Sequence, residues 1–179
     1  MQTATDQDVP TAREKQVSLL FERHRDVVFR AAYRVMGSAA DAEDVLQNVF
    51  LRLLRSEETV VVDETARSYL HRAAVNAAVD LLRRRHAART DPLDDRQERI
   101  PDPRPDPAAV ADVAALRSRL RAALAELSPR SAEIFVLSCF EGYGNREIAR
   151  MLGTSWSTVS VSLHRTRARL RKSALGGLR

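Results

Sequence analysis

The side chains best suited to recognising another molecule lie near the C-terminus, in a segment with the spacing of a helix-turn-helix. Residues 145–171 predict a short helix, a turn of about four residues that contains glycine, and a longer helix. In such a unit the start of the second helix reaches base edges, here with Ser155, Trp156, Ser157, Thr158 and Ser160. Groups farther along the helix meet phosphates, here Arg165, Arg167, Arg169, Arg171 and Lys172. The alternative is a solvated charged helix in an ordinary bundle, because the pattern has many false positives.

A second set of polar side chains lies on a predicted helix around residue 47. Asp44, Gln47, Asn48 and Leu51 are spaced as neighbours on the face opposite its apolar stripe. An exposed leucine among carboxylate and amide groups is typical of a partner-binding patch. The other interpretation is an isolated surface leucine, which is common.

A third set shares one side of the next predicted helix. Its members suit contacts with phosphates and bases, and equally suit water: Arg72, Asn76, Asp80, Arg83 and Arg84. The spacing alone leaves both interpretations open.

Residues for catalysis or metal binding are sparse. The four histidines are scattered and do not combine with cysteine or carboxylates in a metal-ligand spacing, and there is no phosphate-binding loop or nucleophile elbow. Gly142-Tyr143-Gly144 is interpreted as a turn between helices, and Cys139 as a small core residue. We therefore expect no enzyme activity, no metal and no cofactor.

Composition favours an all-α protein and permits an anionic partner without demonstrating one. Of the 179 residues, 44% are hydrophobic but only 5% aromatic, and there are 6 glycines, which disfavours a sandwich or barrel with glycine-rich turns. The net charge of +5 is unevenly distributed, because residues 113–179 carry 12 basic and 4 acidic side chains whereas residues 91–112 carry 3 and 7. The C-terminal part is therefore the strongly basic one.

Apolar periodicity and prolines divide the chain into two helical bodies. Five of the seven prolines fall between residues 92 and 107, which predicts an acidic, semi-stiff linker. The predicted segments are a flexible tail over 1–14, a helical domain over 15–88, a linker over 89–112 and a second helical domain over 113–179. Apolar stripes predict three helices in the first domain, with Ser38 as an N-cap, and four in the second, with Ser128 and Ser155 as N-caps.

The predicted compartment is the cytoplasm. A single cysteine excludes an internal disulfide framework and suits reducing conditions. No apolar run reaches the roughly 20 residues of a membrane span, and the N-terminus lacks the features of a secretory signal.

Three motifs in this order around a linker resemble the bacterial sigma factors of RNA polymerase, of the compact extracytoplasmic-function (ECF) group. DAEDVLQNVFLRLLR (Asp41–Arg55) is similar to the helix that grips the clamp coiled coil of the polymerase β′ subunit. YLHRAAVNAAVDLLRRR (Tyr69–Arg85) resembles the helix that faces the minus-ten promoter element. The segment Leu127–Leu170 resembles the domain that reads the minus-thirty-five element.

The resemblance implies roles for individual residues. The residues implied to bind the polymerase are Asp44, Gln47, Asn48 and Leu51. Those implied to contact the minus-ten element are Tyr69, Arg72, Asn76, Arg83 and Arg84. Those implied to contact the minus-thirty-five element are Ser155, Trp156, Ser157, Thr158, Ser160, His164, Arg165 and Arg167. The loop from about Glu57 to Glu64 falls where the family captures an unstacked base during melting.

The resemblance also implies the partners, and two departures bear on them. It implies binding to core RNA polymerase (β′ clamp and β subunit) and promoter DNA, control by an anti-sigma factor, and a monomeric free state without membrane insertion. Tyr69 stands where the family usually has tryptophan, and Ser160 and Ser162 stand where basic residues are usual.

The function predicted from the three motifs is that of a sigma factor. The alternatives are a stand-alone helix-turn-helix transcriptional regulator and a recombinase with a serine nucleophile, although no serine lies beside an evident base.

Overall fold

The computed structural model describes residues 11–56, 64–89 and 107–175, and over these residues the chain forms α-helices and no strand. The helices are α1 (Ala12–Met36), α2 (Ala39–Arg55), α3 (Glu64–Arg89), α4 (Pro107–Ala125), α5 (Pro129–Cys139), α6 (Asn145–Met151) and α7 (Trp156–Leu175). The expected all-α class is confirmed. Within the described part, no helix is long and apolar enough to cross a membrane.

Side-chain caps explain where several helices begin. The predicted caps are confirmed, because Ser38 Oγ accepts a hydrogen bond from the Asp41 amide and Ser128 Oγ from the Ser131 amide. A cap that we did not predict starts α1: Thr11 and Glu14 form a reciprocal capping box. The helix therefore begins at Ala12, inside the tail predicted over 1–14.

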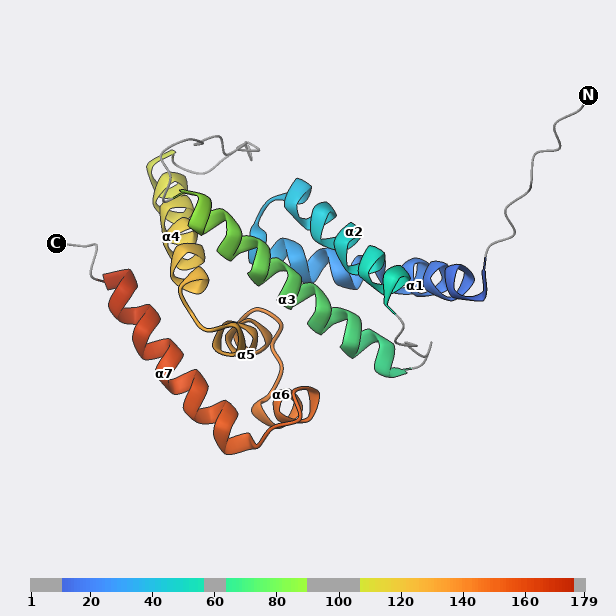
Figure 1. Cartoon of the computed structure of the whole chain (residues 1–179). Helices are drawn as coiled ribbons and strands as arrows, with labels where there is room; N and C mark the ends of the chain where they lie inside the picture. Colours follow the sequence, from blue (N-terminus) through green and yellow to red (C-terminus); the bar gives the residue numbers. More distant parts are fainter. Residues whose placement is uncertain (1–10, 57–63, 90–106, 176–179) are drawn as a thin grey trace, which may run out of the picture.

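Helices α1, α2 and α3 pack on one another and form the N-terminal body (Figure 1). Its largest fully buried side chains include Leu20, Val28, Leu70 and Val75, which fall on the predicted apolar stripes or beside them. The apolar stripes predicted for these helices also include Phe21, Leu54 and Tyr69, which are exposed. Three helices cover only part of each helix surface, so the edges of a wide stripe stay in contact with solvent.

Helices α4 to α7 form the C-terminal body, with α7 in contact with α4, α5 and α6. Leu124, Ile134, Leu137, Ile148 and Val159 are buried at its centre. The prediction for Cys139 is wrong, because it is exposed. Cys139 is the last residue of α5 and lies beyond the continuous buried run from Ala132 to Leu137.

The predicted linker over 89–112 is too long at its C-terminal end. Helix α4 already begins at Pro107, because proline is well tolerated in the first turn of a helix and the alanine-rich sequence after it favours helix. Residues 90–106 lie outside the described residues, as do residues 57–63 of the predicted melting loop.

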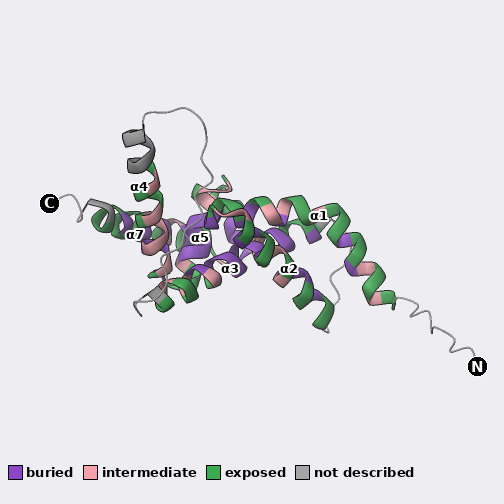
Figure 2. Cartoon of the chain, turned by 90° about the horizontal axis from the view of Figure 1, so that it is seen from above, coloured by how far each residue is buried: buried purple, intermediate pink, exposed green. Residues whose placement is uncertain are grey.

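The two bodies lie against each other, with α3 as the shared element. Helix α3 contacts α1 and α2 on one side and α4 and α5 on the other (Figure 1). Figure 2 shows buried residues running continuously from α3 into α5. The sequence predicted two bodies held by a tether, but did not predict that they share an interface.

Candidate polymerase and promoter interfaces

The predicted polymerase-binding residues share one exposed wall of α2. Asp44, Gln47, Asn48 and Leu51 line an open groove of about 650 Å³ between α2 and α3. The Leu51 side chain is 47% exposed although it lies among polar groups. The prediction of an exposed leucine within a polar patch is confirmed, and its role in polymerase binding stays a prediction.

Helix α3 forms the opposite wall of this α2 groove. Ala77 and Leu81 line it, and Arg84 adds a guanidinium group beside Arg52 and Arg55 of α2. The structure therefore places Arg84 with the polymerase-binding set and away from Arg72 and Asn76, with which the sequence had grouped it. The cause is the helical turn, because residues 72 and 84 differ by about 120° in phase around the helix.

The other polar side of α3 faces the C-terminal body. Arg72 Nε donates to Glu133 Oε1 over 2.7 Å, and Asn76 Nδ2 donates to the same oxygen over 3.0 Å. The Glu133 side chain is only 6% exposed. A carboxylate this deeply buried needs a hydrogen-bonded cation, so Arg72 and Asn76 of α3, together with Arg130 of α5, supply what the fold requires at this point.

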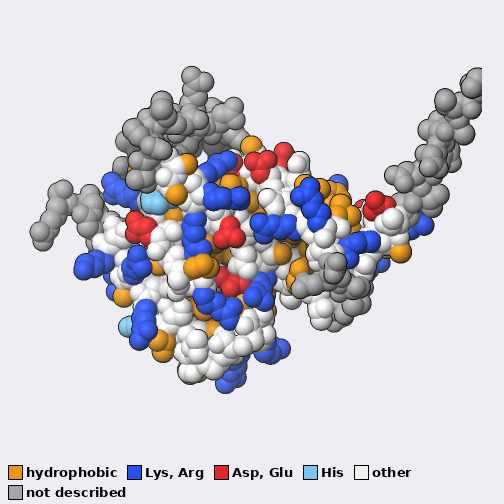
Figure 3. All heavy atoms as spheres, in the orientation of Figure 1, with side chains coloured by type: hydrophobic (Ala, Val, Ile, Leu, Met, Phe, Trp, Pro, Cys, Tyr) orange, Lys and Arg blue, Asp and Glu red, His pale blue; other side chains and the backbone are white. Residues whose placement is uncertain are grey.

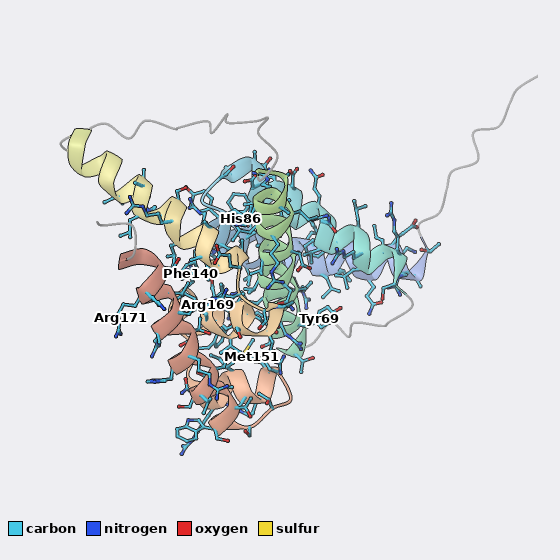
Figure 4. All side chains as sticks on the ribbon, turned by 60° about the vertical axis from the view of Figure 1, so that its left-hand side comes forward. Tyr69, His86, Phe140, Met151, Arg169 and Arg171 are labelled. Carbon is cyan, nitrogen blue, oxygen red and sulfur yellow. The ribbon has the colours of Figure 1, made fainter. Side chains whose placement is uncertain are left out.

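Two more side chains of this α3 side are engaged differently. Arg83 Nη2 donates to the carbonyl oxygen of Leu127, at the turn between α4 and α5. Tyr69, one turn before Arg72, is 43% exposed and its ring lies free of the C-terminal body (Figure 4). Of the residues predicted to face the minus-ten element, Arg72, Asn76 and Arg83 are thus in contact with α5, α6 and the turn between α4 and α5.

The predicted helix-turn-helix is present as α6, a turn at Gly153 with φ of 58°, and α7. Ser155 is the N-cap of α7, because its Oγ accepts from the Thr158 amide over 3.1 Å. The same oxygen lies 2.8 Å from the hydroxyls of Ser157 and Thr158. Trp156 is 55% exposed at the helix start. The hydroxyl groups at the start of α7 therefore already bond one another, and the indole is the group left open for contact.

The remaining residues predicted to face the minus-thirty-five element lie on the outer side of α7. Ser160, His164 and Arg167 line a shallow groove of about 370 Å³ with Asn145 and Arg171. Arg165 is exposed next to it. Figure 3 shows mostly basic side chains along α7, and Figure 4 shows Arg171 pointing outward from it. All the residues predicted to face the minus-thirty-five element thus lie in the first four turns of α7 or at its cap.

A second buried carboxylate joins the two bodies at the end of α5. Glu141 Oε2 lies 2.7 Å from His71 Nε2 and also pairs with Arg34 of α1. Burial by itself would raise the pKa of Glu141. The hydrogen bond from His71 and the charges of His71 and Arg34 outweigh that effect and hold the pKa below its ordinary value of 4.5.

Sequence reasoning missed Glu133, Glu141, Arg34 and His71 as interface residues. The signal for Glu133 was a carboxylate directly before the apolar run Ile134–Leu137, within residues 113–179, which hold only 4 acidic side chains. Arg130 of the same helix supplies one cation, because its Nη1 lies 3.3 Å from Glu133 Oε2, but the second cation comes from another element. Nothing local could identify that cation, because Arg72 is 61 residues away in the chain.

Potential metal ligands do not gather anywhere in the described residues, where no group of three His, Cys, Asp or Glu side chains could hold an ion. The Sγ atom of the exposed Cys139 lies 3.8 Å from Arg167 Nη2. These residues therefore carry no argument for metal or nucleophilic chemistry.

Comparison with known proteins agrees with this layout. Residues 20–88 match the family "Sigma-70 region 2" and residues 117–170 match "Sigma-70, region 4". The first covers most of α1 and all of α2 and nearly all of α3; the second covers part of α4 and the helices up to α7. The matches leave out the predicted linker.

Individual relatives carry the same description. The chain is 36% identical over 152 residues to ECF RNA polymerase sigma factor SigE of Mycolicibacterium smegmatis, covering 85% of this chain and 59% of that protein. It is 35% identical over 151 residues to ECF RNA polymerase sigma factor SigM of Mycobacterium tuberculosis, covering 84% and 73%. The crystal structure of the extracytoplasmic function sigma factor SigJ of Mycobacterium tuberculosis matches with a TM-score of 0.46 at 26% identity, covering 86% of this chain and 52% of the other. The chain therefore belongs to the ECF sigma factors of the sigma-70 family, proteins that direct RNA polymerase in transcription initiation and are not in general enzymes.

Proposed function

We propose that this chain binds core RNA polymerase through the α2 groove and has no catalytic activity of its own. The observation that carries the proposal is that the exposed Asp44, Gln47 and Leu51 line one groove with the half-buried Asn48. An exposed leucine ringed by carboxylate and amide groups gives a partner both apolar area and directional hydrogen bonds. The groove thus suits a helical element of the polymerase clamp.

We propose further that α3 and α7 contact promoter DNA at the minus-ten and minus-thirty-five elements. The exposed Tyr69 supports the first contact because an aromatic ring can stack on an unpaired base. The outward basic groups of α7 support the second contact, since arginine pairs with phosphates. Both contacts require the protein to meet the polymerase and its template, which places its action in the cytoplasm.

An anti-sigma factor is the regulator that we propose, acting on a monomeric free chain. The family membership supports this proposal, and the half-exposed Trp156 offers a large anchor for such a partner. Co-expression with a candidate anti-sigma protein should give a stable complex that Trp156→Ala weakens. The absence of a stable complex with any co-expressed candidate would contradict the proposal.

The polymerase proposal is tested by native mass spectrometry of the purified chain mixed with core RNA polymerase. We expect a one-to-one complex that Asp44→Ala/Gln47→Ala weakens by on the order of tenfold, because two polar contacts are lost. The control is Glu43→Ala, which removes an exposed carboxylate from α2 outside the groove. If no complex formed and the free chain instead bound a symmetric DNA site tightly, it would be a stand-alone regulator.

A further inference from the structure

The contact between the two bodies uses the same α3 side chains that are proposed to face the minus-ten DNA. Arg72 and Asn76 both donate to one oxygen of Glu133, and Arg72 Nη1 also donates to the carbonyl oxygen of Met151 over 3.3 Å. Arg83 donates to the carbonyl oxygen of Leu127. In the described structure the donor groups of these three residues therefore point at acceptors of the C-terminal body.

Glu133 offers α3 the same chemistry as a nucleic acid. A carboxylate and a phosphate are both compact anions that accept charge-assisted hydrogen bonds from a guanidinium group. Asn76, which could otherwise read a base edge, is held by the same carboxylate oxygen. A DNA strand and α5 therefore compete for the same donors, and only one of them can occupy this side of α3.

Three other contacts hold the bodies in this position. Glu141 pairs with Arg34 and His71 of the N-terminal body, and its side chain is 4% exposed. Arg121 of α4 donates through Nε to the carbonyl oxygen of Val35 over 3.1 Å. The arrangement is thus anchored on both sides of the Glu133 contact, by α4 and by the end of α5, so a strand cannot displace Glu133 without separating the bodies.

The proposed surface for the minus-thirty-five element stays open in the same arrangement. Trp156, Arg165 and Arg167 are exposed, and none of them lies in the contact between the bodies. Figure 4 shows α7 on the far side of α5 from Tyr69. The contact therefore blocks one proposed DNA surface and leaves the other accessible.

We propose that the free chain is autoinhibited by this contact, in which Glu133 occupies Arg72 and Asn76 in place of the minus-ten strand. The inference rests on the proposed promoter contacts of α3. The bodies must separate before single-stranded DNA binds, whereas duplex binding through α7 needs no separation. Binding of the polymerase to the α2 groove and to the C-terminal body would supply the free energy for separation.

The test compares variants on the two sides of one contact in the full-length free chain. Glu133→Gln removes the charge that competes with DNA and keeps Arg72, whereas Arg72→Ala breaks the same contact and also removes the proposed DNA ligand. The probe is a fluorescein-labelled single-stranded DNA oligonucleotide of randomised sequence, and an unlabelled duplex of the same length measures α7 binding. Glu22→Gln is the charge-matched control, because Glu22 is exposed on α1.

We expect single-strand binding to tighten in Glu133→Gln but not in Arg72→Ala. Glu133→Gln should bind the single strand on the order of tenfold tighter than the wild type, since the binding-competent form becomes more populated. Arg72→Ala should show no such gain, and duplex binding should change little in either variant. A contact that merely stabilises the fold would change both variants in the same direction.

Small-angle X-ray scattering tests the separation without DNA. The wild type should be compact, and Glu133→Gln/Glu141→Gln should have a larger radius of gyration, with Glu141→Gln alone as the second variant if Glu133→Gln does not fold. The proposal is overturned if Glu133→Gln binds the single strand no tighter than Glu22→Gln does, or if the wild type is already as extended as the double variant. Failure of the proposed function is a different result, namely no complex with core RNA polymerase, so the two failures are distinguishable.

Discussion

At the scale of single residues, Glu133 and Glu141 decide how the two bodies meet. Each is nearly buried, and each is paired with side chains of the other body, Glu133 with Arg72 and Glu141 with Arg34 and His71. Each carboxylate has more than one partner, since Glu133 also pairs with Arg130 of its own helix, so removing one partner weakens the compensation of a buried charge. These carboxylates therefore confer specificity on the interface as well as stability.

The depressed pKa of Glu141 predicts how the stability of the chain responds to acid. Its folded pKa lies below the ordinary value of 4.5, so its contribution is fully present above that value and is lost as the pH falls through the folded pKa. Urea unfolding followed from about pH 7 down to about pH 3.5 should show a steeper loss of stability in the wild type than in Glu141→Gln. Equal slopes for the two proteins would mean that His71 and Arg34 do not stabilise the ionised form.

At the scale of elements, α7 combines two surfaces along one helix. Val159, Leu163 and Leu170 are buried against the rest of the C-terminal body, while the arginines between them face solvent. The helical repeat separates the two sets, so α7 can be held firmly and still present its charge outward. This positioning suits phosphate contacts more than a flexible basic tail would.

Salt dependence tests the outward face of α7. Arg165→Ala/Arg167→Ala should weaken duplex binding by the full chain and lower the slope of log K against log salt by about 2, because about one counterion is released for each phosphate contact. Arg117→Ala/Arg119→Ala is the matched control, since it removes the same charge from exposed positions on α4. Duplex binding that does not respond to salt would contradict the phosphate-contact model.

At the scale of the whole molecule, two bodies of helices are joined through one shared helix. Helix α3 belongs to the core of the N-terminal body and also contacts α4 and α5. Buried residues are continuous across that junction (Figure 2). Loss of structure in one body therefore removes partners from the other, which couples their unfolding.

This coupling predicts a single thermal transition for the wild type, followed by circular dichroism. Glu133→Gln/Glu141→Gln should unfold about 4 to 8 °C lower, or in two steps, because each change weakens a charge-assisted contact between the bodies. The control Glu22→Gln/Glu43→Gln makes the same change in net charge at exposed positions and should unfold near the wild type. Identical melting of the two double variants would show that the bodies unfold independently.

Local sequence alone determined the helices, their caps and the two-body organisation of this protein. Ser38 and Ser128 cap the helices that they were predicted to start, and Leu51 is exposed as the α2 pattern predicted. These features depend on residues three or four positions apart, where periodicity and hydrogen bonding act directly.

Only the tertiary structure decided what the polar side of α3 touches and which groove Arg84 lines. Arg72 meets Glu133 across 61 residues of chain, and Glu141 meets Arg34 across 107. Spacing along a helix shows that Arg72, Asn76 and Arg83 share a side, but the same pattern suits DNA, water or a second body. Their partners follow from how α4 and α5 pack against α3, because a buried carboxylate such as Glu133 binds the cation that packing places within its reach.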